Sequence, residues 1–175
     1  LGINMALNGK WNLNQLNNKY MENKITAFFW FNHDLKEVIN YYQDIFNREA
    51  QMNFEEVAYH LVSDAPGQRV ELATVRLFGN TYHFMAAQGP FAFNESVSLM
   101  ISTLDQAETD YYWEAFTKEG KESDCGWCKD KYGMSWQVTP KRLMELNASP
   151  DKEVASYSMQ QMMTMKKIVI KDLEK

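Results

Sequence analysis

An internal repeat constrains the fold of this chain more than any other feature of its sequence. Residues 25–31 are mostly apolar, as is typical of a buried strand, and a second strand-like run follows about 70 residues later, at 97–101. After each run comes Asp-x-x-Glu, then Tyr-Tyr, then a Phe four residues after the second Tyr. The pattern begins at Asp34 in the first copy and at Asp105 in the second. We therefore interpret the two halves as a duplicated unit.

Each half predicts a strand, a helix and further strands. Residues on one face of the first predicted helix are Leu35, Val38, Ile39, Tyr42 and Phe46. Strands are predicted at 51–59, 70–79 and 82–88 in the first half, and at 122–128 and 134–139 in the second. Turn signals lie at 64–67 and 130–133, and the Gly79-Asn80 pair fits a tight hairpin.

Composition excludes several classes of protein. The 175 residues carry a net charge of −5, and 45% of them are hydrophobic, which indicates an ordered globular chain rather than a disordered or nucleic-acid-binding one. The sequence has no apolar run of about 18 residues, the length that a membrane-spanning helix needs. The first 20 residues lack the apolar core of a signal peptide. Two cysteines cannot build a disulfide framework. We therefore expect a cytoplasmic protein with no nucleic-acid or membrane partner.

The two ends of the chain differ from the repeat. Residues 1–20 contain six asparagines without apolar periodicity, which favours an N-terminal extension outside the fold, disordered or of cloning origin; the alternative is a short surface helix around Trp11. At the other end, Ser149-Pro150-Asp151 predicts a helix start capped by Ser149. This tail is rich in methionine and is predicted to pack on its own domain, to form a subunit interface or to cover a pocket.

The longest motif of the chain carries a family resemblance. The motif at 125–140 reads Cys125-Gly-Trp-Cys-Lys-Asp-Lys-Tyr-Gly-Met-Ser-Trp-Gln-Val-Thr-Pro140. It resembles the PhnB-like branch of the vicinal-oxygen-chelate, or glyoxalase, superfamily. The same resemblance is carried by residues 25–31, Tyr41-Tyr42 and Phe84-Met-Ala86. Domains of this branch are often labelled 3-demethylubiquinone-9 3-methyltransferase. The resemblance covers about residues 22–170.

The resemblance implies an α+β fold. Two tandem β-α-β-β-β modules would form one curved, mostly antiparallel eight-stranded cup, followed by C-terminal helices, and the protein would be a homodimer. We expect a single domain over 21–175, with modules at about 22–90 and 91–140 and a helical tail at 141–175.

The resemblance also implies a divalent metal, held by His, Glu or Gln at four strand positions. In this chain those positions fall near Thr26 or Ala27, Ala87 or Gln88, and Val97 or Ser98, and at Gln137, where active relatives carry Glu. None of them is a His or a carboxylate. Neutral amides and hydroxyls hold a dication poorly against water, so we expect a vacated metal site and no cofactor, with a divalent metal as the alternative.

The candidate residues of a ligand pocket are Gln88, Gln137, His83, Cys125, Trp127 and Trp30. Among the three histidines, only His83 lies within a predicted strand, where it shares a face with Met85 and Ala87. Trp30, Trp127 and Trp136 are candidates for a ligand platform, although tryptophan is more often a core residue. Cys125 and Cys128 are spaced as in redox centres, but they precede a turn and a strand rather than a helix, and no second pair exists for structural zinc.

Four functions compete at this stage. The leading one is a glyoxalase-like protein that binds an unidentified small molecule. The alternatives are a metal-dependent lyase, isomerase or dioxygenase of the same superfamily, and a non-catalytic dimeric interaction module. A methyltransferase, as the family label suggests, would normally need a glycine-rich strand–helix turn, and the sequence has no such motif.

Overall fold

The computed structural model describes residues 25–48 and 51–175, so the predicted extension at 1–20 lies outside the described residues. The chain divides into two compact units, Leu1–Gln88 and Gly89–Lys175. Each contains one open four-stranded mixed sheet with a helix between its first two strands, so the predicted α+β fold of two β-α-β-β-β modules is confirmed.

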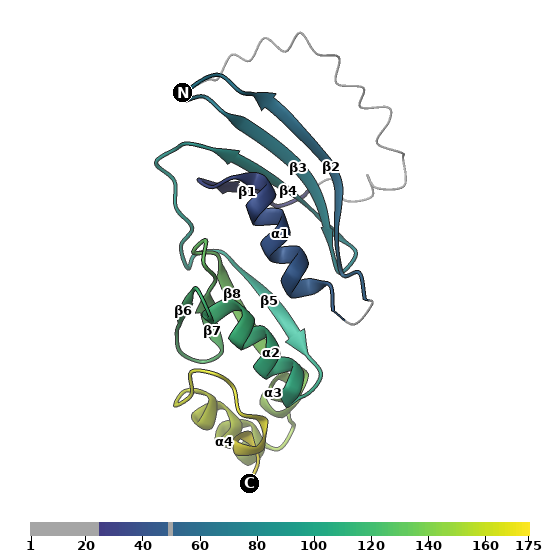
Figure 1. The fold of residues 1–175 in the computed structure, drawn as a ribbon. Coiled ribbons are helices and arrows are strands. Elements are labelled where there is room, and N and C mark those ends of the chain that lie inside the picture. Colours follow the sequence, from purple (N-terminus) through teal and green to yellow (C-terminus); the bar gives the residue numbers. More distant parts are fainter. Residues whose placement is uncertain (1–24, 49–50) are drawn as a thin grey trace. The chain divides into compact units, whose positions relative to one another are not determined.

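In residues 25–48 and 51–88, the first unit has one helix and four strands, which can be followed in Figure 1. Its elements are β1 (Phe28–Phe31), α1 (Leu35–Phe46), β2 (Phe54–Ser63), β3 (Val70–Leu77) and β4 (Asn80–Ala87). The strand order is β1-β4-β3-β2; β1 runs parallel to β4 and the other neighbours are antiparallel. The predicted hairpin is present, but its turn is Phe78-Gly79 rather than Gly79-Asn80, because both take positive φ, at 46° and 80°.

Helix α1 packs on one face of its sheet because its apolar residues recur at helical spacing. Asp34 caps its start by accepting the N–H groups of Lys36 and Glu37 at 2.9 and 3.1 Å. Tyr42 on the helix meets Phe31 and Phe84 of the sheet, with ring centroids 6.3 and 5.9 Å apart. These contacts show which sheet face the helix covers.

Glu71 is a carboxylate beneath the start of α1. The residue is only 1% exposed. Its oxygens accept hydrogen bonds from the Leu35 N–H at 3.3 Å, from Arg69 at 3.0 Å and from the Tyr59 hydroxyl. Burial raises the pKa of Glu71, but these hydrogen bonds outweigh it and the net pKa is lowered. Burial and the Glu71 hydrogen bond raise the pKa of Tyr59 to about 12.

The second unit repeats the module and adds the tail. Its elements are β5 (Ser98–Thr103), α2 (Gln106–Thr117), β6 (Lys121–Glu122), β7 (Trp127–Lys129), β8 (Ser135–Pro140), α3 (Lys141–Asn147), α4 (Lys152–Met162) and a short 3₁₀ helix, η2 (Ile170–Leu173). The strand order β5-β8-β7-β6 matches that of the first sheet, with β5 parallel to β8. Asp105 caps α2 by accepting the Glu108 N–H at 2.9 Å. Phe116 of α2 stacks on Trp136 of β8 at 4.4 Å.

Two predicted boundaries in this unit were wrong. The strand expected at 122–128 is interrupted, because Cys125 and Gly126 both take positive φ, at 57° and 83°, and form a turn between β6 and β7. The tail helix begins two residues later than expected. Asp151, rather than Ser149, caps α4 by accepting the N–H groups of Glu153 and Val154.

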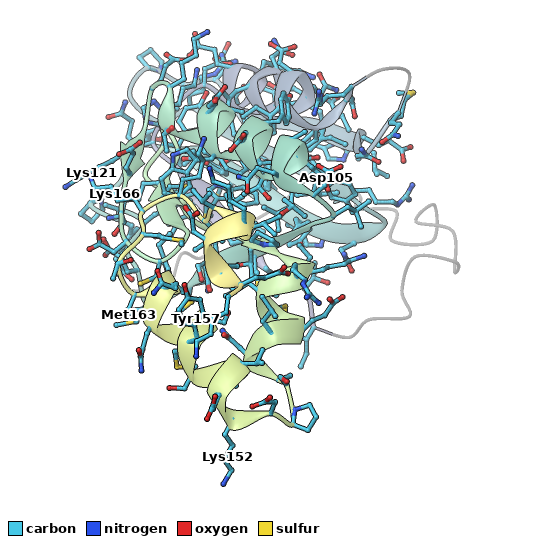
Figure 2. The ribbon with its side chains drawn as sticks, turned by 90° about the horizontal axis from the view of Figure 1, so that it is seen from below. Asp105, Lys121, Lys152, Tyr157, Met163 and Lys166 are labelled. Atoms are coloured by element: carbon cyan, nitrogen blue, oxygen red, sulfur yellow. The ribbon has the colours of Figure 1, made fainter. Side chains whose placement is uncertain are left out.

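The tail folds back onto the turn at Cys125 and Gly126. The N–H groups of these two residues donate to the carbonyls of Met165 and Lys166, both at 2.7 Å. Figure 2 shows Met163 at the end of α4 and Lys166 on the returning segment, near Lys121 of β6, in agreement with the ion pair between Lys166 and Glu122 at 3.4 Å. The apolar core beneath the tail consists of Leu143, Leu146, Ile168 and Leu173, with Met162 and Met165 against it.

The side chain of Gln106 ties the tail to α2. Its Nε2 donates to the Ile168 carbonyl at 3.1 Å, and its Oε1 accepts the Ile170 N–H at 2.8 Å. The returning segment is therefore held by α2 as well as by the turn. In residues 25–48 and 51–175, no helix combines the length and apolar character that crossing a bilayer requires.

Candidate functional site

Each sheet has one face covered by its helix and one face that the helix does not cover, which we call the open face. Side chains alternate between the two faces along a strand. Phe31 and Phe84 face α1, and Trp136 faces α2, as their ring contacts show. The neighbours of these residues along each strand therefore point to the open face, where four of the six candidate site residues are found.

The open face of the first sheet carries Trp30 and His83. Phe28 and His83 are register partners, and Trp30 pairs with Met85. The indole N–H of Trp30 donates to the Ala87 carbonyl at 2.7 Å, which fixes the ring against the end of β4. Two of the predicted pocket residues thus share this face.

His83 is held on this face by two neighbours. Its Nδ1 lies 3.1 Å from the Thr74 hydroxyl oxygen, in a hydrogen bond, and its ring lies 6.1 Å from that of Phe28. Burial lowers the pKa of His83, which favours the neutral imidazole at neutral pH. Thr74 was not among the predicted site residues. Thr74 lies opposite His83 because of the register between β3 and β4, and this register cannot be read from the sequence.

The open face of the second sheet brings Gln137 and Trp127 together. They are direct register partners across β7 and β8, and Met100 is the partner of Gln137 on the other side. Gln137 Nε2 donates to the Ser98 hydroxyl at 2.9 Å. Gln137 and Trp127, 10 residues apart in the printed sequence, are therefore adjacent side chains on one surface.

Two predicted site residues lie apart from the open faces. Gln88 is exposed just beyond the end of β4. Cys125 lies in the turn before β7, where its Sγ is 3.8 Å from Met163 Sδ. Cys128 is fully buried, and burial, followed by the charges of Asp130 and Glu122, raises its pKa to about 12. This is the opposite of the lowered thiol pKa that a redox pair needs.

Asp130 is a buried anchor whose role the sequence analysis missed. We identified it only as the start of a turn. In the structure Asp130 Oδ1 accepts the N–H groups of Tyr132 and Met134 at 2.9 and 3.1 Å, and Oδ2 accepts the Trp136 indole N–H at 2.9 Å. An Asp followed three residues later by Gly is a signal for such a side-chain-stabilised turn. Asp130 thus fixes β8 and, next to Trp136, the position of Gln137.

The residues at the expected metal positions do not fit a divalent cation. Gln137 and Ser98, which occupy two of these positions, are hydrogen-bonded to each other. Within the described part of the chain, no three His, Cys, Asp or Glu side chains are grouped as a metal site requires. An amide and a hydroxyl carry no negative charge to offset a dication.

Comparison with known proteins identifies the family. The family model described as 3-demethylubiquinone-9 3-methyltransferase matches residues 23–139. A PhnB protein from Bacillus cereus is 24% identical over 67% of this chain and 99% of its own, with a TM-score of 0.58. A protein from Pseudomonas aeruginosa is 16% identical over 66% and 96%, with a TM-score of 0.50.

Another similar structure is the fosfomycin resistance protein FosX from Listeria monocytogenes, which is 11% identical over 66% of this chain and 88% of its own, with a TM-score of 0.48. No curated protein matches the chain. The family model spans well over half of the sequence and the fold agrees with it. The chain therefore belongs to the 3-demethylubiquinone-9 3-methyltransferase family, the PhnB-like branch of the glyoxalase, or vicinal-oxygen-chelate, superfamily.

Proposed function

We propose that this protein binds a small molecule on the open face of its second sheet, at a position where related enzymes hold a metal ion. The observation that carries this proposal is the hydrogen bond of 2.9 Å between Gln137 Nε2 and Ser98 Oγ. The amide of Gln137 and the hydroxyl of Ser98 are groups that orient a ligand by hydrogen bonds, whereas a site with neither carboxylate nor imidazole offers no strong ligand to hold a dication against water.

The surroundings of Gln137 support a binding role. Trp127 is half-buried, and Met100 is 50% exposed. Aromatic and thioether groups supply apolar contact area, while a few polar groups fix the orientation of a ligand. In the first unit, His83 with Thr74 offers a comparable combination beside Phe28 and Trp30.

Methyl transfer is not part of the proposal. A nucleotide-like methyl donor normally binds at a glycine-rich turn between a strand and a helix. The connection from β1 to α1 consists of Asn32-His33-Asp34, and that from β5 to α2 of Leu104-Asp105. Neither contains a glycine that would let a backbone approach a phosphate closely.

A homodimer in the cytoplasm completes the proposal. The exposed side chains of Met159 and Met163, at 50% and 65%, form part of an adaptable surface on the tail that suits a second copy of the chain. Cys125 and Cys128 are both free thiols, as is usual in a reducing compartment. Analytical ultracentrifugation of the purified protein tests the dimer, and a monomer at all concentrations would overturn it.

Metal analysis and a ligand screen test the binding function. Protein purified with added manganese, zinc, nickel and iron salts is expected to carry far less than one metal ion per chain. In a thermal-shift screen, compounds that stabilise the wild type should lose their effect in Gln137→Leu. The matched control is Gln160→Leu, which alters an exposed glutamine of α4. Stoichiometric metal would show that the metal site is retained. Hits unaffected by Gln137→Leu would place binding elsewhere.

A further inference from the structure

Trp127 differs from the other described tryptophans in its indole N–H group. Trp30 donates to the Ala87 carbonyl at 2.7 Å, Trp113 to Glu122 at 3.3 Å and Trp136 to Asp130 at 2.9 Å. Within the described residues, the Trp127 N–H has no such internal acceptor. An indole N–H usually finds a partner when its ring is buried in part, so Trp127 has a donor available for water or for a ligand.

Gln137 offers the complementary group. Its Nε2 is engaged with Ser98 Oγ, and this assignment leaves Oε1 as an acceptor with no hydrogen bond from the described residues. Because Trp127 and Gln137 are direct register partners, their side chains leave the sheet on the same face, with Cβ atoms about 5 Å apart. One donor and one acceptor are thus presented by adjacent residues.

Next to Gln137 this face carries no charge, because its partner on β5 is Met100 and the following pair is Ser102 with Thr139. The cation beside Trp127 is Lys129, two residues further along β7 on the same face, where it pairs with Lys121 of the edge strand β6. The ammonium of Lys129 is 2.6 Å from Glu95 Oε1, a contact that lowers the pKa of Glu95 and neutralises the lysine charge. A charged ligand next to Gln137 would therefore lack a counter-charge.

We propose that the open face of the second sheet binds a neutral, hydroxyl-bearing ring of the sugar type, with Trp127 Nε1 as donor and Gln137 Oε1 as acceptor. A hydroxyl group both accepts and donates, so one ligand hydroxyl, or two neighbouring ones, satisfies both protein groups. This inference rests on the proposed binding function and specifies its ligand class.

A series of hexoses that differ in charge tests the ligand class. Binding of glucose, glucuronate and protonated glucosamine to the full-length protein is measured by saturation-transfer NMR titration. Glucose is expected to bind about tenfold more tightly than either charged sugar, and Trp127→Phe should weaken glucose binding by about tenfold, because the ring remains while its N–H is lost. Trp113→Phe is the control, since this tryptophan lies on α2 and its indole N–H is already bound to Glu122.

The outcomes separate the ligand class from the binding function. Tighter binding of glucuronate would assign the ligand to the lysine edge and overturn the neutral class. Equal loss of affinity in Trp127→Phe and Trp113→Phe would overturn the role of the Trp127 N–H. If no hexose binds but compounds from the thermal-shift screen still depend on Gln137, the sugar class is wrong and the binding function stands. If neither binds, both are wrong.

Discussion

The carboxylate of Asp130 and the indole of Trp136 are joined by a hydrogen bond of 2.9 Å in the interior of the second unit. Asp130 is 2% exposed and Trp136 is 3% exposed. The other carboxylate oxygen accepts two backbone N–H groups of the turn that precedes β8. Because the ring of Trp136 also stacks on Phe116, this one carboxylate links a turn, a strand and a helix.

Replacing Asp130 by alanine is expected to lower the free energy of unfolding by about 3 kcal/mol, since buried N–H groups lose their acceptor. Asp130→Asn should cost less, about 1 kcal/mol, because one carbonyl oxygen remains. Urea unfolding followed by tryptophan fluorescence measures both. Glu145→Gln, which alters a salt bridge in which the glutamate is 63% exposed, serves as the control and should have almost no effect. Equal stability of Asp130→Ala and wild type would contradict this role.

A methyl group at Gly126 should destabilise the protein more than one at Gly133. Both glycines have positive φ, at 83° and 82°, but a Cβ at Gly126 would lie 2.9 Å from the Val138 carbonyl oxygen and 3.1 Å from Ile168, whereas one at Gly133 would meet nothing within 4 Å. Gly133→Ala should cost about 1 kcal/mol through backbone strain alone, and Gly126→Ala about 3 kcal/mol. Thermal denaturation compares them, and equal losses would show that the tail yields to the added methyl group.

Acid should remove the stability that Glu71 provides. Its folded-state pKa is lowered, so its contribution is fully present above the unfolded pKa of about 4.3 and is lost as the pH falls through the folded value. Glu71→Gln should therefore be less stable than wild type at neutral pH, by roughly 2 kcal/mol. The difference should shrink below about pH 4. Urea unfolding across this range measures it; exposed Glu119→Gln is the control. A difference that does not vary with pH would contradict the prediction.

The two cysteines should react very differently with alkylating reagents. With a pKa of about 12, Cys128 has roughly one thiolate in ten thousand at pH 8, and it is also buried. Iodoacetamide should therefore label Cys125 alone in the native protein and both cysteines in urea, as mass spectrometry will show. A reversible disulfide between Cys125 and Cys128 would restore the redox interpretation that their spacing first suggested.

The repeat and its helix caps were predictable because they depend on local chemistry. Asp34 and Asp105 accept N–H groups at the starts of α1 and α2, as an Asp-x-x-Glu signal indicates. The hairpin after β3 was predictable from its glycine, but its exact turn was not. Phe78 takes a positive φ that is unusual for a phenylalanine, and its ring packs on Phe46, 5.9 Å away. The positive φ of Phe78, which local sequence preference disfavours, thus occurs together with a tertiary contact to Phe46.

The interruption of the strand at 122–128 and the position of the tail could not be predicted. Both depend on bonds between Cys125 or Gly126 and residues about 40 positions later in the chain, which no local pattern encodes. Gln137 and Trp127 were predicted as separate pocket residues, and only the strand register makes them neighbours. Their role in binding stays a prediction. No sequence pattern indicated that Glu71 would be buried and hydrogen-bonded, because its partners come from three different segments of the chain.

The amide of Gln106 has a consequence for how this sequence can change over evolutionary time. It recognises the backbone at Ile168 and Ile170 with one donor and one acceptor. Position 126, by contrast, is limited to glycine by its φ of 83° and by the Val138 carbonyl oxygen of β8, as well as by Ile168 of the tail. We expect homologues that shorten or lose the tail to have another residue at position 106 and still a glycine at position 126, whereas homologues that retain the tail should preserve Gln106.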